Sequence, residues 1–141
     1  MTDLEKAKAL LESGNYGNCV LYKDNIFHTS KGRGISPMLE FFDAELDMKG
    51  FSAADTVAGK AAALLFALAG VTEVYADIMS QSAVNTFNRF GINCTYDKLT
   101  ENIKNRAGTG LCPMENAVSN INDPKEALPA IQKTLKNIMR N

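Results

Sequence analysis

The most apolar stretch of the chain runs from Ser52 to Gly70, where only Asp55 and Lys60 carry charge. The stretch is too short and too rich in alanine to predict a membrane span. With Ser52 as the N-cap residue, Asp55 three residues on and Gly70 as the stop, the pattern predicts one helix over this stretch. Because that helix is apolar on nearly every face, we expect it to be the central helix of a layered domain.

Before this stretch, the pattern predicts a helix, a hairpin and a second helix. Apolar residues at helical spacing indicate an amphipathic helix over residues 2–13. Two β-rich runs, residues 18–23 and 26–30, flank Asp24-Asn25, whose residue types tolerate the positive φ angles of a tight turn. A proline in the first turn favours a helix over residues 36–48.

After the central stretch, the pattern alternates between strand and helix. Residues 71–76 and 92–96 are β-rich, and residues 79–90 between them have a helical pattern that ends at a glycine. A strand, a helix and a strand of these lengths predict a right-handed parallel crossover. We therefore expect a single α/β domain over residues 1–141, a three-layer α/β/α sandwich whose mixed sheet has an N-terminal antiparallel hairpin followed by parallel strands.

Three further helices are expected in the C-terminal part. The pattern indicates a short helix over residues 99–105 and another over residues 112–121. Asp123-Pro124 marks the start of the last helix, in which Pro129 predicts a bend or a restart.

Composition narrows the function classes. A net charge of −1 argues against a general binder of nucleic acids or acidic membranes, which needs an excess of basic residues. The three cysteines are odd in number and widely spaced, so a disulfide framework is not expected. Acidic residues near the N-terminus do not fit a signal peptide. We therefore expect a cytoplasmic protein with no nucleic-acid and no membrane partner.

Four short motifs stand out along the chain. They are Gly32-Arg33-Gly34-Ile35, Ala58-Gly59-Lys60-Ala61-Ala62, Val74-Tyr75-Ala76 and Gly108-Thr109-Gly110-Leu111-Cys112-Pro113-Met114-Glu115. Together they resemble the domain of unknown function 1893 family of prokaryotes over about residues 10–130, and the last motif is the most specific. The resemblance implies a cytidine deaminase-like fold, with a hairpin, a buried helix and parallel strands.

The resemblance does not bring deaminase chemistry with it. Zinc deaminases of this fold hold the metal with a His or Cys near the start of the buried helix and with two cysteines at the start of the next helix. Here residues 58–60 and 77–81 stand at those places, and they contain neither Cys nor His. We therefore expect no zinc site, no cofactor and no zinc-dependent deamination. Whether the protein is an enzyme stays open.

Cys112 is the main candidate for covalent chemistry. It precedes Pro113 at a predicted helix start, where unpaired N–H groups and the helix dipole lower the pKa of a thiol. Glu115 in the same turn competes for those N–H groups and raises that pKa. The alternative is that Cys112 is a small apolar cap under a loop. Cys19 and Cys94 lie in β-rich runs and are expected in the core.

Two basic loops with glycines each lead into a predicted helix and suit an anion. Arg33 lies in the first loop and Arg106 in the second, and the side chain of Lys60 either meets an anion as well or extends to solvent. We expect these groups to converge at the carboxyl ends of the strands. The predicted ligand-binding residues are Arg33, Lys60, Arg106, Gly108, Thr109 and Gly110.

Three functions fit this pattern. The first is binding of an anionic small molecule, with a nucleotide as one candidate. The second is an enzyme or sulfur carrier in which Cys112 is the catalytic thiol and Glu115 or Lys60 the proton partner. The third is a catalytically silent interaction domain that docks through its amphipathic first and last helices. The pattern also leaves open whether the chain forms a homo-oligomer.

Overall fold

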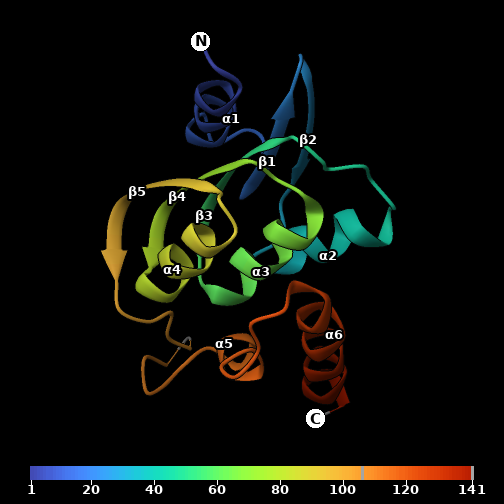
Figure 1. The fold of residues 1–141 in the computed structure, drawn as a ribbon, viewed down its shortest axis with the longest axis vertical. Coiled ribbons are helices and arrows are strands. Elements are labelled where there is room, and N and C mark those ends of the chain that lie inside the picture. Colours follow the sequence, from blue (N-terminus) through green and yellow to red (C-terminus); the bar gives the residue numbers. More distant parts are fainter. Residues whose placement is uncertain (106, 141) are drawn as a thin grey trace.

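The computed structural model describes residues 1–105 and 107–140, which form a sheet of five strands in the order β2-β1-β3-β4-β5 (Figure 1). Strand β1 is antiparallel to both β2 and β3, whereas β3, β4 and β5 are parallel. The strands are β1 (Cys19–Lys23), β2 (Ile26–Ser30), β3 (Ser52–Ala58), β4 (Glu73–Ser80) and β5 (Asn93–Thr100). This confirms the predicted mixed sheet, in which a hairpin precedes the parallel strands.

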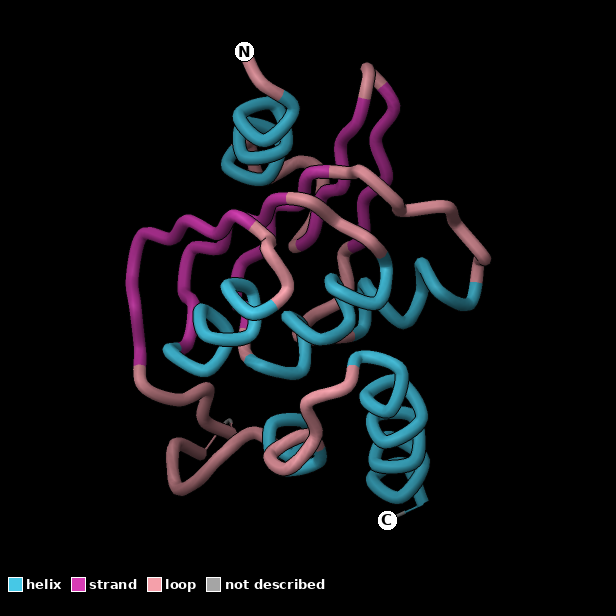
Figure 2. Tube along the Cα trace, viewed as in Figure 1, coloured by secondary structure: helices cyan, strands magenta, loops and turns pink. Residues whose placement is uncertain are grey.

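Helices cover both faces of the sheet (Figure 2). Helix α1 packs on β1, β3 and β4, while α3 and α4 pack on the opposite face, and α2, α5 and α6 contact α3. The helices are α1 (Asp3–Glu12), α2 (Ser36–Asp43), α3 (Lys60–Ala69), α4 (Gln81–Arg89), α5 (Pro113–Ala117) and α6 (Pro124–Arg140). The arrangement is therefore the expected α/β/α sandwich.

The hairpin turn forms as its sequence predicts. Asp24 and Asn25 have φ angles of 49° and 67°, so both turn residues are in the left-handed region that a two-residue hairpin requires. Thr2 caps α1, since its side-chain oxygen accepts a 3.1 Å hydrogen bond from the N–H of Glu5.

The predicted helix from Ser52 to Gly70 is wrong in its first half. This stretch forms two elements, β3 and α3, which meet at Gly59. The segment that forms β3 is rich in alanine and shows no alternation, because as a central strand it is buried on both faces. Pairing with β1 and β4 overrides its helical preference. Asp55 is consequently a buried strand residue and not a helix cap.

Helix α3 is the central helix, as expected. Residues 61–66 are all buried, and the ring of Phe66 lies 6.3 Å from the ring of Phe87 on α4. The main core lies between the sheet and this helical layer, and a smaller core lies under α1. Gly70 ends α3 with a φ of 82°, which confirms its role as the stop residue.

Several predicted boundaries are wrong for physical reasons. Strand β4 continues to Ser80, whose side-chain oxygen caps α4 by accepting a 3.1 Å hydrogen bond from the N–H of Ala83. Strand β5 runs to Thr100 and pairs with β4 along its length, so no helix forms over residues 99–105. Helices α2 and α5 are shorter than predicted. Helix α6 passes through Pro129 without a restart.

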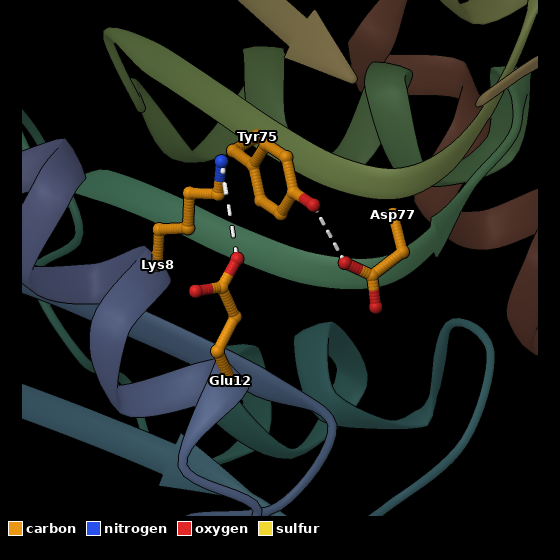
Figure 3. Close-up of polar contacts among 4 residues, drawn as sticks. All are labelled: Lys8, Glu12, Tyr75 and Asp77. Atoms are coloured by element: carbon orange, nitrogen blue, oxygen red, sulfur yellow. Dashed lines mark hydrogen bonds and ion pairs between the residues drawn. The ribbon is translucent and has the colours of Figure 1, made fainter. Parts of the chain in front are cut away.

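A polar cluster fixes α1 to the sheet on the face away from α3 (Figure 3). The Nζ atom of Lys8 lies 4.5 Å from the centre of the Tyr75 ring and 3.8 Å from Oε1 of Glu12. The Tyr75 hydroxyl donates a 2.7 Å hydrogen bond to Asp77. Burial and the neighbouring carboxylates of Asp77 and Asp97 raise the pKa of Tyr75. The hydroxyl therefore stays protonated and serves as a donor.

Within residues 1–105 and 107–140, no helix combines the length and the apolar character that crossing a membrane requires.

Candidate functional site

A cavity of about 390 Å³ lies beside the N-terminal end of α3, and we call it the α3 cavity. The loop before α2, the end of β3, helix α5 and the end of α6 all contribute to its wall. Its polar lining residues are Arg33, Ser36, Cys112 and Glu115, and its apolar lining residues include Ile35, Val57, Ala62, Ile103, Leu135 and Ile138. Cavities of roughly 300–1,000 Å³ with mainly apolar walls and a few polar groups are typical of small-molecule sites.

Glu115 is the most highly constrained polar group of the cavity. Its Oε1 accepts a 2.8 Å hydrogen bond from the N–H of Lys60, and its Oε2 accepts a 2.9 Å hydrogen bond from the N–H of Ala61. The residue is only 9% exposed. The first N–H groups of a helix have no partner within the helix, and they attract negative charge. A carboxylate from α5 therefore caps α3.

Gly59 is required by this contact. It precedes α3, and a Cβ atom there would clash with Oε1 of Glu115 and would lie 2.6 Å from its Cδ. The same Cβ would lie 2.8 Å from Cγ1 of Ile103. The backbone conformation of Gly59 is extended and suits any residue. Space for the Glu115 carboxylate, and not backbone freedom, is thus what selects glycine here.

The side chain of Lys60 does not line the α3 cavity. Its Nζ donates a 3.2 Å hydrogen bond to the carbonyl oxygen of Ser119. Burial lowers the pKa of Lys60 and the charge of Arg89 lowers it further, whereas Glu115 raises it. It is thus the backbone N–H of Lys60, and not the side chain, that binds a carboxylate, whereas the ammonium group binds a carbonyl oxygen.

Arg33 lines the cavity from the loop before α2, a different element from the α5 helix that carries Glu115. It is exposed, and its carbonyl oxygen accepts a 3.1 Å hydrogen bond from the N–H of Ser36 at the start of α2. The next residue, Gly34, has a φ of 60°, so the loop turns sharply there. The loop therefore brings Arg33 to the lining of the same cavity as Glu115.

Cys112 is the N-cap residue of α5, as the sequence predicts, and its thiol makes no capping hydrogen bond. It is half-buried and lines the α3 cavity. The prediction that Glu115 competes with the Cys112 thiol for the N–H groups of α5 is wrong, because the Glu115 carboxylate binds the N–H groups of α3 instead. Cys19 lies in the core, as predicted, whereas Cys94 is only partly buried and packs against the core. Burial raises the pKa of both thiols.

The described residues of the second glycine loop do not line the α3 cavity. Gly108, Thr109 and Gly110 are exposed and are not among the lining residues. Asn105 accepts hydrogen bonds from two of the loop amides, with its backbone oxygen from Gly108 at 3.0 Å and with its side chain from Thr109 at 3.1 Å. These amides are therefore engaged within the loop. Arg106, the predicted cation of this loop, lies outside the described residues.

The residues at the helix starts do not fit a deaminase-type zinc site. Helix α3 begins after Gly59 and helix α4 after Ser80, and neither start presents a thiolate or an imidazole. In the part of the chain that the structure describes, no three His, Cys, Asp or Glu side chains lie together as metal ligands.

Several lining residues were not predicted from the sequence. In the sequence, Gly59 is part of a motif and Ser36 marks a helix start, and neither residue indicates a ligand site by itself. The apolar wall residues carry no sequence signal that separates them from core residues, and Leu135 and Ile138 come from the far end of the chain.

The family model of TM1506, a domain of unknown function (DUF1893), matches residues 6–135. The chain belongs to this family. A solved member, the DUF1893 family protein TM1506 from Thermotoga maritima, is 25% identical and superposes with a TM-score of 0.80. The match covers 96% of this chain and 89% of that chain. The family that the motifs resemble is thereby confirmed.

Two deaminases match more distantly. One is a diaminohydroxyphosphoribosylaminopyrimidine deaminase/5-amino-6-(5-phosphoribosylamino)uracil reductase from Thermotoga maritima, 18% identical, with a TM-score of 0.43 over 67% of this chain and 35% of that chain. The other is the dCMP deaminase of cyanophage S-TIM5, 11% identical, with a TM-score of 0.47 over 69% of this chain and 94% of that chain. Both TM-scores are below 0.5, and no activity follows from these matches. No curated protein matches the chain.

Proposed function

We propose that the α3 cavity binds an anionic small molecule, and that a nucleoside monophosphate is the class that fits its lining best. One observation carries the proposal, namely that Arg33 and Glu115 line the same apolar cavity. A guanidinium group binds phosphate or carboxylate oxygens through two parallel hydrogen bonds. A carboxylate oxygen has acceptor capacity beyond the single backbone bond that each Glu115 oxygen makes here.

The two charged groups define how the ligand lies. Its anionic end is attracted to Arg33 and repelled by Glu115, so the phosphate lies toward the loop before α2. Its N–H donors lie toward Glu115, as the ring N–H and amino groups of a base would. Between them, Ile35, Val57 and Ile103 offer apolar surface for a planar ring.

A thermal-shift panel of nucleosides and their 5′-monophosphates tests this proposal. Binding to the folded state raises the melting temperature, so we expect monophosphates to stabilise the protein more than nucleosides do. Arg33→Ala should weaken monophosphate binding about tenfold, which corresponds to about 1.4 kcal/mol. Arg89→Ala is the matched control, because Arg89 is exposed on α4 and outside the cavity lining. Stabilisation by no compound, or equal weakening by both variants, would contradict the proposal.

A second candidate function is supported by the position of Cys112 in the same cavity lining. A thiol beside a bound ligand is placed for nucleophilic attack or sulfur transfer. Glu115 is the candidate proton partner because it lines the same cavity, whereas the ammonium group of Lys60 binds Ser119. Site-resolved alkylation tests this candidate, with Cys19 and Cys94 as internal controls. We expect a bound monophosphate to slow alkylation of Cys112 alone. Unchanged alkylation at saturating monophosphate would count against a thiol that acts on the ligand.

A further inference from the structure

A second hollow, of about 310 Å³, adjoins the α3 cavity, and Val57 and Ile103 line both. We call it the lysine hollow. Its other lining residues are Ile78, Lys98, Thr100, Asn102 and Lys104. Because the two share a wall, a ligand that extends past Val57 and Ile103 reaches both.

The lysine hollow lies at the carboxyl ends of the three parallel strands. Val57 is the penultimate residue of β3, Ile78 lies near the end of β4, and Thr100 is the last residue of β5. Figure 1 shows the chain passing along this edge of the sheet from β5 to α5. In open α/β sheets, ligands bind in the crevice at these strand ends.

The charge of the lysine hollow has a single sign. Its lining contains two lysines and no carboxylate, and both lysines are exposed. Within residues 1–105 and 107–140, neither ammonium group has a carboxylate partner. A β-bridge with Leu111 holds the backbone at Lys104. Lysine ammonium groups bind phosphate as compact charges, and a threonine hydroxyl adds a donor.

We propose that the lysine hollow is a second anion subsite, which takes a phosphoryl group of the ligand in the α3 cavity. This inference rests on the proposed function, because it assigns a second part of the same ligand. The ligand class is then a nucleotide with two separate phosphoryl groups. One lies near Arg33 and the other lies between Lys98 and Lys104.

Pyrophosphate is a probe for the subsite that does not depend on the base. In ¹H–¹⁵N NMR titrations of the full chain, we expect saturable shifts of the Thr100 and Asn102 amide signals. The double variant Lys98→Ala/Lys104→Ala should weaken pyrophosphate binding at least tenfold. The double variant Lys125→Ala/Lys133→Ala, with both changes at exposed positions of α6, should leave binding unchanged. Absence of saturable shifts, or equal weakening in both double variants, would overturn the subsite.

Nucleotides then test the link between the two hollows. A nucleoside 3′,5′-bisphosphate should bind at least tenfold more tightly than the 5′-monophosphate, and Lys98→Ala/Lys104→Ala should remove that gain. A bisphosphate without any gain would overturn the link. If pyrophosphate shifts Thr100 while no nucleotide shifts the Lys60 and Ala61 amides, the proposed function fails and the subsite stands. If nucleotides shift the Lys60 and Ala61 amides while pyrophosphate does not shift Thr100, the proposed function stands and only the subsite is overturned.

Discussion

The Oε1 atom of Glu115 lies 2.8 Å from the backbone nitrogen of Lys60, a residue 55 positions earlier in the chain. This bond joins α5 to the start of the central helix and places a carboxylate in the lining of the α3 cavity. A carboxylate from α5 thus caps α3 from within the cavity lining.

The contact between Gly59 and Glu115 is expected to give non-additive mutations. Gly59→Ala adds a Cβ where the Glu115 carboxylate lies, which should cost about 1–3 kcal/mol of unfolding free energy. Glu115→Ala removes two charge-assisted hydrogen bonds and should also cost about 1.5–3 kcal/mol. In the double variant the clash with Glu115 is gone and only that with Ile103 remains. Urea denaturation should therefore give less than the sum, and effects that add within about 0.5 kcal/mol would contradict this contact.

Lys60→Ala is expected to be milder than Glu115→Ala. Replacing the side chain removes the bond to Ser119, but the backbone N–H of residue 60 remains capped by Glu115. We expect a loss below about 1 kcal/mol in urea denaturation, because a single partly exposed hydrogen bond contributes little. A loss as large as that of Glu115→Ala would mean that the lysine side chain, and not the carboxylate, stabilises the start of α3.

Asp55 should make the protein less stable as pH rises. Burial raises its pKa to about 8, and the charge of Asp77 raises the pKa further. Hydrogen bonds from the backbone N–H groups of Thr56 and Val57 act in the opposite direction and lower the pKa. In the unfolded chain an Asp titrates near 3.9, so between about pH 4 and 8 the folded state binds more protons. The unfolding free energy therefore falls across this window, by at most about 1.4 kcal/mol per pH unit, and levels off above pH 8.

Asp55→Asn should remove that slope, which urea denaturation at pH 5 and pH 8 would reveal. Asp43→Asn is the control, because Asp43 is exposed at the end of α2. If Asp55→Asn keeps the full pH dependence of the unaltered protein, another group carries it.

Phe66 should be among the most sensitive core positions. It is fully buried on α3, and its ring lies 6.3 Å from that of Phe87. Phe66→Ala should cost about 3–5 kcal/mol, since the surrounding helices cannot fill the volume that the ring leaves. Phe90→Ala, where the ring is 38% exposed, should cost far less. Similar losses in thermal or urea denaturation for both variants would contradict the central position of α3.

The parts of the fold that depend on local chemistry were predicted from the sequence. The Asp24-Asn25 turn depends on residues that tolerate positive φ, and the end of α3 depends on Gly70. The strand β3 was not predicted, because a run of small residues buried on both faces has neither strand alternation nor strong β propensity. Only its pairing with β1 and β4 decides its conformation.

The sequence predicted several residues of the candidate site from their chemistry, but it did not predict the contacts that they make. Arg33, Cys112 and Glu115 were chosen for their chemistry, and all three line the α3 cavity. The capping of α3 by Glu115 spans 55 residues, and no local pattern encodes such a contact. The loop at Gly108 resembled an anion site, but Asn105 takes up its amides. Lys98 lies on β5 beyond the predicted end of that strand, and Lys104 lies after the strand where a helix was predicted, yet both line the lysine hollow.

The most direct measurement is a ¹H–¹⁵N NMR titration with a nucleoside 5′-monophosphate, observed at the amides of Lys60 and Ala61. Both amides donate to Glu115, so a ligand that binds Glu115 from the cavity must change their signals. We expect saturable shifts at these two amides that weaken about tenfold in Arg33→Ala. Signals that stay fixed while the melting temperature rises would place the ligand elsewhere and contradict the α3 cavity as the binding site.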